Sequence, residues 1–323
     1  MLRTVKKTCT DAQPTSYAAV VTGATGYIGG HLVRRLLAEG HEVYAILRVS
    51  SDLTCLPSEI CNDVHFHVQR YGEYDEMPQT FSEIAAREER SVLFHLAADV
   101  QSGNHRYEDI PRLMESNLAF GTALVDAAIR SGVKDVVSTG TYWQLDANGG
   151  YKPVNLYAAT KQAFGDILQY YEDAEGLRVV TLLLYDTYGP SIGTRKRTKI
   201  LDYLREHADE PVTVEMSPGE QRLSYVYIDD VVNAYLMAAA RLVKDGVAAC
   251  GTYAVRCEMD MSLRDIVERY LAMLGAHLHV HWGGRPYRPR DPMMPCETIP
   301  VLPGWRAEIS LDEGLRRSLT DVH

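Results

Sequence analysis

A tyrosine and a lysine stand four residues apart in the stretch NLYAATKQAF, which runs from residue 155 to 164. On a helix, positions i and i+4 are neighbours, so Tyr157 and Lys161 would point into the same space. An ammonium beside a phenol favours the phenolate and brings proton exchange closer to neutral pH. The spacing therefore predicts an acid/base pair. The alternative is structural, with Lys161 a solvated surface residue and Tyr157 part of the core.

A second group of residues has the pattern of a phosphate-binding turn. In VTGATGYIGG, three glycines recur every third residue between an apolar run at 17–23 and a helical pattern at 27–40. Glycines there permit a tight turn, close approach of a pyrophosphate and close helix packing, while the helix N-terminus supplies amides. The pattern predicts a dinucleotide site whose residues are Gly23, Thr25, Gly26, Tyr27, Ile28 and Gly29.

The residue type at the end of the second strand bears on the choice of dinucleotide. Arg48 stands 25 residues after Gly23, where an NAD site usually has an acidic residue for the ribose hydroxyls. An arginine with Ser50 and Ser51 nearby suits the 2′-phosphate of NADP. We therefore expect NADP, with Arg48 and Ser50 at the phosphate. A solvent-facing Arg48 in an NAD site is the alternative.

Alternating elements must position these residues. Apolar strand-like runs alternate with amphipathic segments such as 112–131, which indicates a parallel sheet covered on both faces. The runs lie at 17–23, 41–48, 64–68, 91–98, 133–140 and 177–185. We expect an α/β fold with a doubly wound parallel sheet over residues 17–190.

The remainder of the chain has a looser pattern. After about residue 190 the parallel count does not continue, and residues 191–323 are expected to form a smaller substrate-binding lobe, interleaved with the first domain. Residues 1–16 carry basic side chains without the apolar segment of a secretory signal. They are expected to be a flexible tail, with an organelle transit peptide as the alternative.

Composition narrows the possible partners. The chain has 323 residues and a net charge of −10, so nucleic acid and acidic membranes are disfavoured and an anionic ligand needs a local basic cluster. No run of 18 uncharged apolar residues suggests a membrane span, and a cytoplasmic protein is expected. His277, His279 and His281 alternate without a fourth ligand, so no metal site is predicted. Cysteines without metal or disulfide spacing are read as structural: Cys9, Cys55, Cys61, Cys250, Cys257 and Cys296.

With HLAA at 95–98 and YAATK at 157–161, these motifs resemble the extended short-chain dehydrogenase/reductase superfamily, and the match covers nearly the whole chain. The resemblance implies a Rossmann-type fold, with Tyr157 as the acid/base and Lys161 lowering its pKa and holding the nicotinamide ribose. In STGTYW it assigns the hydrogen bond to the substrate carbonyl to Thr139, with Ser138 and Thr141 as the other choices. Further cofactor contacts are implied at Ala97, Ala98 and Tyr185.

Within that superfamily, STGTYWQ, YDTYGP and SPGEQ look like the reductases of nucleotide-linked 4-keto-6-deoxy sugars, among them CDP-abequose and CDP-paratose synthases. Where the superfamily's dehydratases have an acid pair after the threonine, this chain has Gly140 and Thr141. Hydride transfer is therefore favoured over dehydration. A nucleotide-sugar 4-epimerase with bound NAD and a catalytically silent NADP-binding regulator remain the rival hypotheses.

The resemblance also implies substrate and subunit contacts. The arginine that the family uses for the substrate diphosphate is replaced by Leu223, and Arg222 lies one position out of phase. The diphosphate is then assigned to Lys199, Arg288 and Arg290, since cationic side chains suit phosphate. Thr141 and Tyr142 are further substrate candidates. Asn117 is expected to support the sheet edge, and helices at 112–131 and 156–174 to form a homodimer interface.

Overall fold

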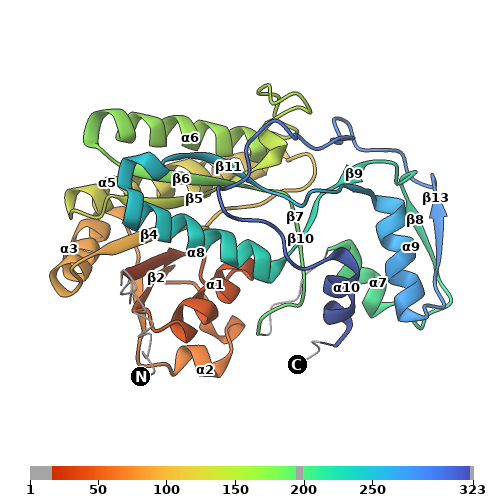
Figure 1. Cartoon of the computed structure of the whole chain (residues 1–323), viewed down its shortest axis with the longest axis horizontal. Helices are drawn as coiled ribbons and strands as arrows, with labels where there is room; N and C mark the ends of the chain where they lie inside the picture. Colours follow the sequence, from red (N-terminus) through yellow and green to blue (C-terminus); the bar gives the residue numbers. More distant parts are fainter. Residues whose placement is uncertain (1–16, 194–198, 321–323) are drawn as a thin grey trace, which may run out of the picture.

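The computed structural model describes residues 17–193 and 199–320, and its centre is a sheet of seven parallel strands (Figure 1). The central apolar runs at 18–22 and 91–95 form strands that are buried on both faces, as in parallel sheets generally. This confirms the predicted doubly wound α/β fold. In spatial order the strands are β11 (Gly251–Val255), β6 (Arg178–Leu184), β5 (Asp135–Thr141), β4 (Ser91–His95), β1 (Ala18–Thr22), β2 (Val43–Arg48) and β3 (Phe66–Tyr71).

Helices cover both faces of this sheet (Figure 1). Successive strand residues point to opposite faces, so Val21 packs with α1 (Tyr27–Ala38) and α8 (Ile228–Asp245). Its neighbour Val20 packs on the other side of the sheet. The helices there are α3 (Met77–Arg87), α5 (Phe120–Arg130) and α6 (Leu156–Glu175). The two apolar clusters fix the positions of the carboxyl ends of the strands.

One element corrects the expected end of the parallel pattern. β11 lies far beyond residue 190, yet it pairs in parallel with β6, with Gly251 opposite Val180. The apolar segment around Ala254 is buried when it covers the edge of β6, which explains why the chain returns to the sheet. β11 is therefore the seventh strand of the main sheet, and α8 packs on that sheet. Both follow the start of the second lobe in the sequence.

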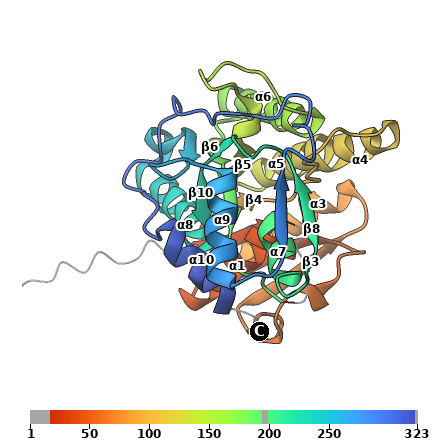
Figure 2. The same cartoon turned by 90° about the vertical axis from the view of Figure 1, so that its right-hand side faces the viewer.

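The smaller lobe lies at one end of the molecule, with α9 and β13 facing the viewer in Figure 2. Three two-stranded pairings build it. They are β7 (Asp186–Tyr188) with β10 (Tyr225–Tyr227), β8 (Thr213–Met216) with β13 (His279–Trp282), and β9 (Arg222–Leu223) with β12 (Met261–Ser262). Its helices are α7 (Ile200–Glu206), α9 (Leu263–Leu274) and α10 (Leu311–Thr320).

The helix expected over residues 112–131 is interrupted. A π-helical turn at Glu115–Ala119 separates α4 (Ile110–Met114) from α5. The short helix α2 (Ser58–Cys61) follows β2. No helix within the two described ranges combines the length and the apolar character needed to cross a bilayer.

Candidate active site

The glycine turn follows β1 directly and has the close contacts expected of it. Gly23 adopts a φ of +72°, and a Cβ there would lie 2.8 Å from the backbone nitrogen of Ala97. A Cβ on Gly29 would overlap the carbonyl oxygen of Gly23. Helix α1 begins at Tyr27, so its first backbone amides face the turn. The turn is therefore shaped as a cradle for a pyrophosphate, and its residues fit a bound dinucleotide.

The end of β4 joins this turn. The Thr22 hydroxyl lies 2.9 Å from Nδ1 of His95 and accepts a hydrogen bond from the amide of Ala97 at 3.2 Å. Burial, followed by the nearby charge of Lys161, lowers the pKa of His95 to about 3. His95 is therefore neutral, and it connects the glycine turn to α6. The backbone of Ala97 passes beside Gly23.

Tyr157 and Lys161 lie one turn apart at the start of α6, which Asn155 caps through a bond to the amide of Ala158. The two side chains are only 7% and 4% exposed, so the surface alternative for Lys161 is wrong. Burial lowers the pKa of Lys161 to about 8. Within the described parts of the chain, no hydrogen bond or ion pair engages its ammonium. A buried cation of this kind calls for a polar ligand, and ribose hydroxyls have the right chemistry.

The pKa of Tyr157 departs from expectation. Burial raises it above the ordinary value of a phenol, so the lowering expected from Lys161 is not seen. The physical reason is that burial disfavours the charged phenolate. Tyr157 is therefore protonated at neutral pH and suited to give a proton. The indole of Trp143 packs edge-on against it, with ring centroids 6.5 Å apart.

Thr139 lies near the end of β5 and is partly exposed, whereas Ser138 is buried. The Thr139 hydroxyl donates to the carbonyl of His95 at 2.9 Å and lies 2.7 Å from the hydroxyl of Tyr235 on α8. Thr141 is also buried, and its hydroxyl accepts from the amide of Trp143 at 3.3 Å. Of the three candidate hydroxyl groups, Thr139 thus combines the predicted position with partial exposure.

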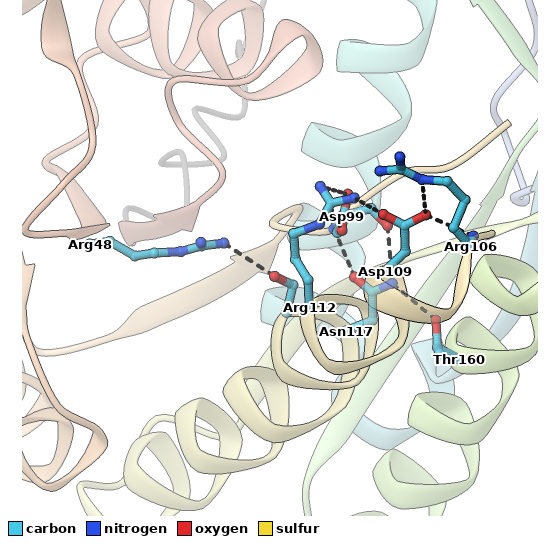
Figure 3. A network of polar contacts seen from close by, with 8 residues as sticks. Arg48, Asp99, Arg106, Asp109, Arg112, Asn117 and Thr160 are labelled. Atoms are coloured by element: carbon cyan, nitrogen blue, oxygen red, sulfur yellow. Dashed lines mark hydrogen bonds and ion pairs between the residues drawn. The ribbon is translucent and has the colours of Figure 1, made fainter.

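Asn117 supports this edge of the sheet from the π-helical turn (Figure 3). Its side chain accepts from the amide of Asp99 at 2.8 Å, and donates to the Asp99 carbonyl and to the Thr160 hydroxyl. Thr160 in turn donates to the carbonyl of Tyr157 at 2.7 Å. Asn117 therefore connects the strand end beyond β4 to the helix that carries the predicted acid, as expected for a supporting role.

Arg48 ends β2 with an exposed side chain, which donates to the hydroxyl of Ser116 at 3.4 Å (Figure 3). Ser50 is exposed in the loop that follows. Arg70 from β3 donates to three carbonyls of this loop, those of Arg48, Val49 and Ser51. The loop is thus held in one shape, with a guanidinium and a hydroxyl open to a ligand.

The predicted substrate residue Tyr142 and cofactor residue Tyr185 are both buried, and their rings stack with centroids 4.6 Å apart. The Tyr142 hydroxyl donates to Asp186 at 3.2 Å. Burial raises the pKa of Asp186 to about 6, partly opposed by the charge of Lys199 and the Tyr142 bond. This half-buried acid was not among the residues expected from the sequence, although it stands in the motif YDTYGP. Tyr185 donates to the Cys296 carbonyl.

The predicted diphosphate cations do not share one set of partners. Lys199 lines a small cavity with Asp186 and Tyr225, whereas Arg288 donates to the Ser102 carbonyl and Arg290 to that of Pro153. Arg222 donates to the Asp260 carbonyl. Residues 195–198, which precede Lys199 in the chain, lie outside the described residues.

The histidine triplet is not gathered as a metal site. In β13, His281 pairs with Glu215 at 2.8 Å. No cluster of three metal-binding side chains occurs in the part of the chain that the structure describes.

A parallel α/β sheet with a glycine turn after a central strand defines the class of dinucleotide-binding Rossmann proteins. A family model described as the NAD dependent epimerase/dehydratase family matches residues 19–251. The chain belongs to this family, which confirms the resemblance inferred from its motifs.

The relatives of this chain include both CDP-abequose synthases and UDP-glucose 4-epimerases. A CDP-abequose synthase of Salmonella typhimurium is 27% identical over 77% of this chain and 78% of its own length. A UDP-glucose 4-epimerase of Mycolicibacterium smegmatis is 26% identical over 93% of this chain and 96% of its own. Among solved structures, the UDP-glucose 4-epimerase of Thermus thermophilus in complex with NAD covers 94% of this chain and 97% of its own. Its TM-score is 0.77 at 23% identity.

Proposed function

We propose that the protein reduces the C4 ketone of a nucleotide-linked 4-keto-6-deoxyhexose with NADPH. The observation that carries this proposal is the buried Tyr157–Lys161 pair, in which the phenol is protonated and the ammonium has no described partner. A reductase needs a proton donor beside the substrate carbonyl, and the phenol of Tyr157, one helical turn from Lys161, can supply the proton. Resemblance to CDP-abequose synthases supports the sugar substrate.

Each residue has a role in this reaction. When bound, NADPH supplies the hydride that forms the new C–H bond at C4. Tyr157 gives its proton to the carbonyl oxygen as negative charge develops there, so that the ketone becomes a secondary alcohol. Thr139 stabilises the same oxygen by hydrogen bonding. Lys161 holds the ribose of the cofactor, and the glycine turn holds its pyrophosphate.

The choice of NADP rests on the loop after β2. Arg48 and Ser50 are exposed there, and a guanidinium pairs well with a 2′-phosphate. NAD remains the less favoured cofactor, although it is present in the epimerase structure from Thermus thermophilus.

A nucleotide-sugar 4-epimerase is the second candidate, because UDP-glucose 4-epimerases match the chain as well as the synthases do. An epimerase would begin by removing a proton from the sugar hydroxyl, which requires a phenolate. The exposed guanidinium of Arg48, which suits the 2′-phosphate of NADP, favours the reductase. Protein purified with tightly bound NAD and indifferent to added NADPH would favour the epimerase.

The decisive experiment is NADPH oxidation with CDP-, dTDP-, GDP- and UDP-linked 4-keto-6-deoxy sugars, followed by NMR of the product. We expect turnover of the sugar linked to at least one of these nucleotides. In the NMR spectrum of the product, the signal of a C4 alcohol should replace that of the ketone. In Tyr157→Phe, kcat should fall by roughly 10²–10⁴-fold while NADPH still binds. Interconversion of UDP-sugars without net NADPH consumption would contradict the reductase.

We also propose that the protein is a homodimer. A broad groove crosses the outer face of α4, the π-helical turn, α5 and α6, and its exposed surface is mainly apolar. A second copy presenting the same helices would cover it, as the resemblance implies. The groove is lined by Pro111, Met114, Glu115, Leu118, Ala119, Thr122, Ala123, Asp126 and Tyr171.

A further inference from the structure

A tyrosine on the opposite face of the sheet reaches the predicted site from within the core. Tyr235 lies in α8 and is completely buried. Its ring belongs to the apolar cluster on that face, yet its hydroxyl lies 2.7 Å from Oγ1 of Thr139. Burial raises the pKa of Tyr235, so its hydroxyl keeps its proton.

The direction of these hydrogen bonds follows from counting protons. A threonine hydroxyl has one proton to give, and that of Thr139 goes to the carbonyl of His95 at 2.9 Å. Tyr235 must then donate to Thr139. The result is a chain from the Tyr235 hydroxyl through the Thr139 hydroxyl to a backbone carbonyl. In this state Thr139 has no proton to offer a ketone in the crevice.

A substrate ketone can change this arrangement without disturbing the core. Thr139 is partly exposed, so its proton can turn from the His95 carbonyl to an oxygen in the crevice. The hydrogen bond from Tyr235 is accepted by a lone pair of the Thr139 oxygen, so it is kept when the Thr139 proton rotates. A hydroxyl that accepts a hydrogen bond is polarised and becomes a stronger donor. Tyr235 would thus strengthen the bond that matters most when charge develops on the substrate oxygen.

We propose that Tyr235 is a positioning residue for the reaction, holding and polarising Thr139 as Thr139 stabilises the developing alkoxide. This rests on the proposed function, because it assigns Thr139 to the substrate oxygen. Tyr235 would stabilise the transition state through Thr139 and would not contribute to the binding of the substrate. Loss of the Tyr235 hydroxyl should therefore lower kcat and leave the binding of NADPH and of the sugar nearly unchanged.

The first test is Tyr235→Phe, which removes one oxygen and keeps the ring. We expect kcat to fall about tenfold, the effect of one hydrogen bond, with KM changed less than about twofold. Tyr44→Phe is the matched control, because Tyr44 is also buried and its hydroxyl bonds Glu88 away from the site. It should retain the kcat of the wild type. If Tyr235→Phe does not fold, Tyr235→Leu removes the same hydroxyl.

The second test asks whether Tyr235 acts through Thr139. In a Thr139→Val background there is no hydroxyl to polarise, so adding Tyr235→Phe should change kcat by less than about twofold. Thr139→Ser keeps the hydroxyl, and the full effect of Tyr235→Phe should return in that background.

Four outcomes separate the hypotheses. Additive effects of Tyr235→Phe and Thr139→Val, or a Tyr235→Phe variant with the kcat of Tyr44→Phe, would overturn the role of Tyr235 and leave the reductase intact. A higher KM for the sugar with unchanged kcat would also overturn it. A wild-type protein that reduces none of the 4-keto sugars would overturn the proposed function itself.

Discussion

The two groups at the centre of the site are shifted in opposite directions by the same burial. A dry pocket disfavours charge, so it keeps the Tyr157 phenol neutral and makes the Lys161 ammonium easier to deprotonate. Spacing along the chain predicted that these side chains would meet. It did not predict which effect would dominate, because burial depends on the packing of His95, Trp143 and α6 around them.

The pKa of Lys161 has a measurable consequence. Below pH 8 the ammonium is charged and can hold ribose hydroxyls as a donor, and above pH 8 it becomes neutral. We therefore expect kcat/KM for NADPH, which reports the free enzyme, to fall as pH rises through about 8. The neighbouring titratable groups do not mask this, since His95 and Tyr157 are both neutral there. A profile that stays flat to pH 9.5 would contradict the assignment.

Asp186 allows a prediction about stability. The pKa is raised from 3.8 to about 6, so protonation favours folding and the carboxyl lowers stability above pH 6. Asp186→Asn keeps an acceptor for Tyr142 without the buried charge. We expect the free energy of unfolding to rise by about 2 kcal/mol at pH 8, opposed partly by loss of the attraction to Lys199.

Urea unfolding of Asp186→Asn and wild type at pH 8, 6 and 4.5 would measure this effect. The gain should shrink as the pH falls, because the wild-type carboxyl becomes neutral. Equal stabilities at pH 8, or a gain that grows towards acid, would refute the assignment. Asp202→Asn is a useful comparison, since that side chain lines the same cavity.

Among the elements, the β1–α1 unit was the most predictable. Its glycines are needed because the turn, Ala97 and the first helical turn approach too closely for side chains. Other elements were not predictable from local pattern. β11 has an ordinary strand sequence, and its place beside β6 is decided by an edge that forms 70 residues earlier. The hydroxyl of Tyr235 reaches Thr139 across 96 positions from an apolar helix face that carries no polar signal.

Two glycine substitutions should have opposite effects. In Gly29→Ala, the new methyl group would overlap the Gly23 carbonyl, and backbone must shift. We expect a loss of about 1–3 kcal/mol in stability and weaker NADPH binding. In Gly165→Ala, on α6, the methyl group would meet nothing within 4 Å. That variant should gain about 0.5–1 kcal/mol, because alanine favours a helix. Thermal unfolding and NADPH titration of both variants measure the difference, and similar behaviour would contradict the cradle.

At the scale of the whole molecule, the smaller lobe is not a separate appendage. Its segments lie between strands of the main sheet in sequence, and Arg288 and Arg290 tie it to loops beside α6. Sequence composition indicated that this half differed from the first, and the interleaving was expected. The arrangement of its short strands was not, because each pairing joins segments far apart in the chain.

The proposed dimer can be tested on the groove over α4 and α5. Met114 is 36% exposed there, and Met114→Glu would place a charge in the apolar contact. We expect the variant to be monomeric in sedimentation experiments at concentrations where the wild type is dimeric. Val64→Glu, on a solvent-exposed residue before β3, should leave the dimer intact. A monomeric wild type, or equal behaviour of the two variants, would rule out this interface.

The return of β11 to the sheet also bears on how the chain is made. While a ribosome has released only the first 190 residues, β6 is a bare edge, and the apolar face that α8 will cover is open to water. The face stays uncovered until α8 has emerged, at residue 245, and the edge of β6 until residue 255 has emerged. A nascent chain stalled inside the lobe would therefore expose apolar surface and an unpaired strand edge to other chains. We expect chaperones to bind its first half during synthesis.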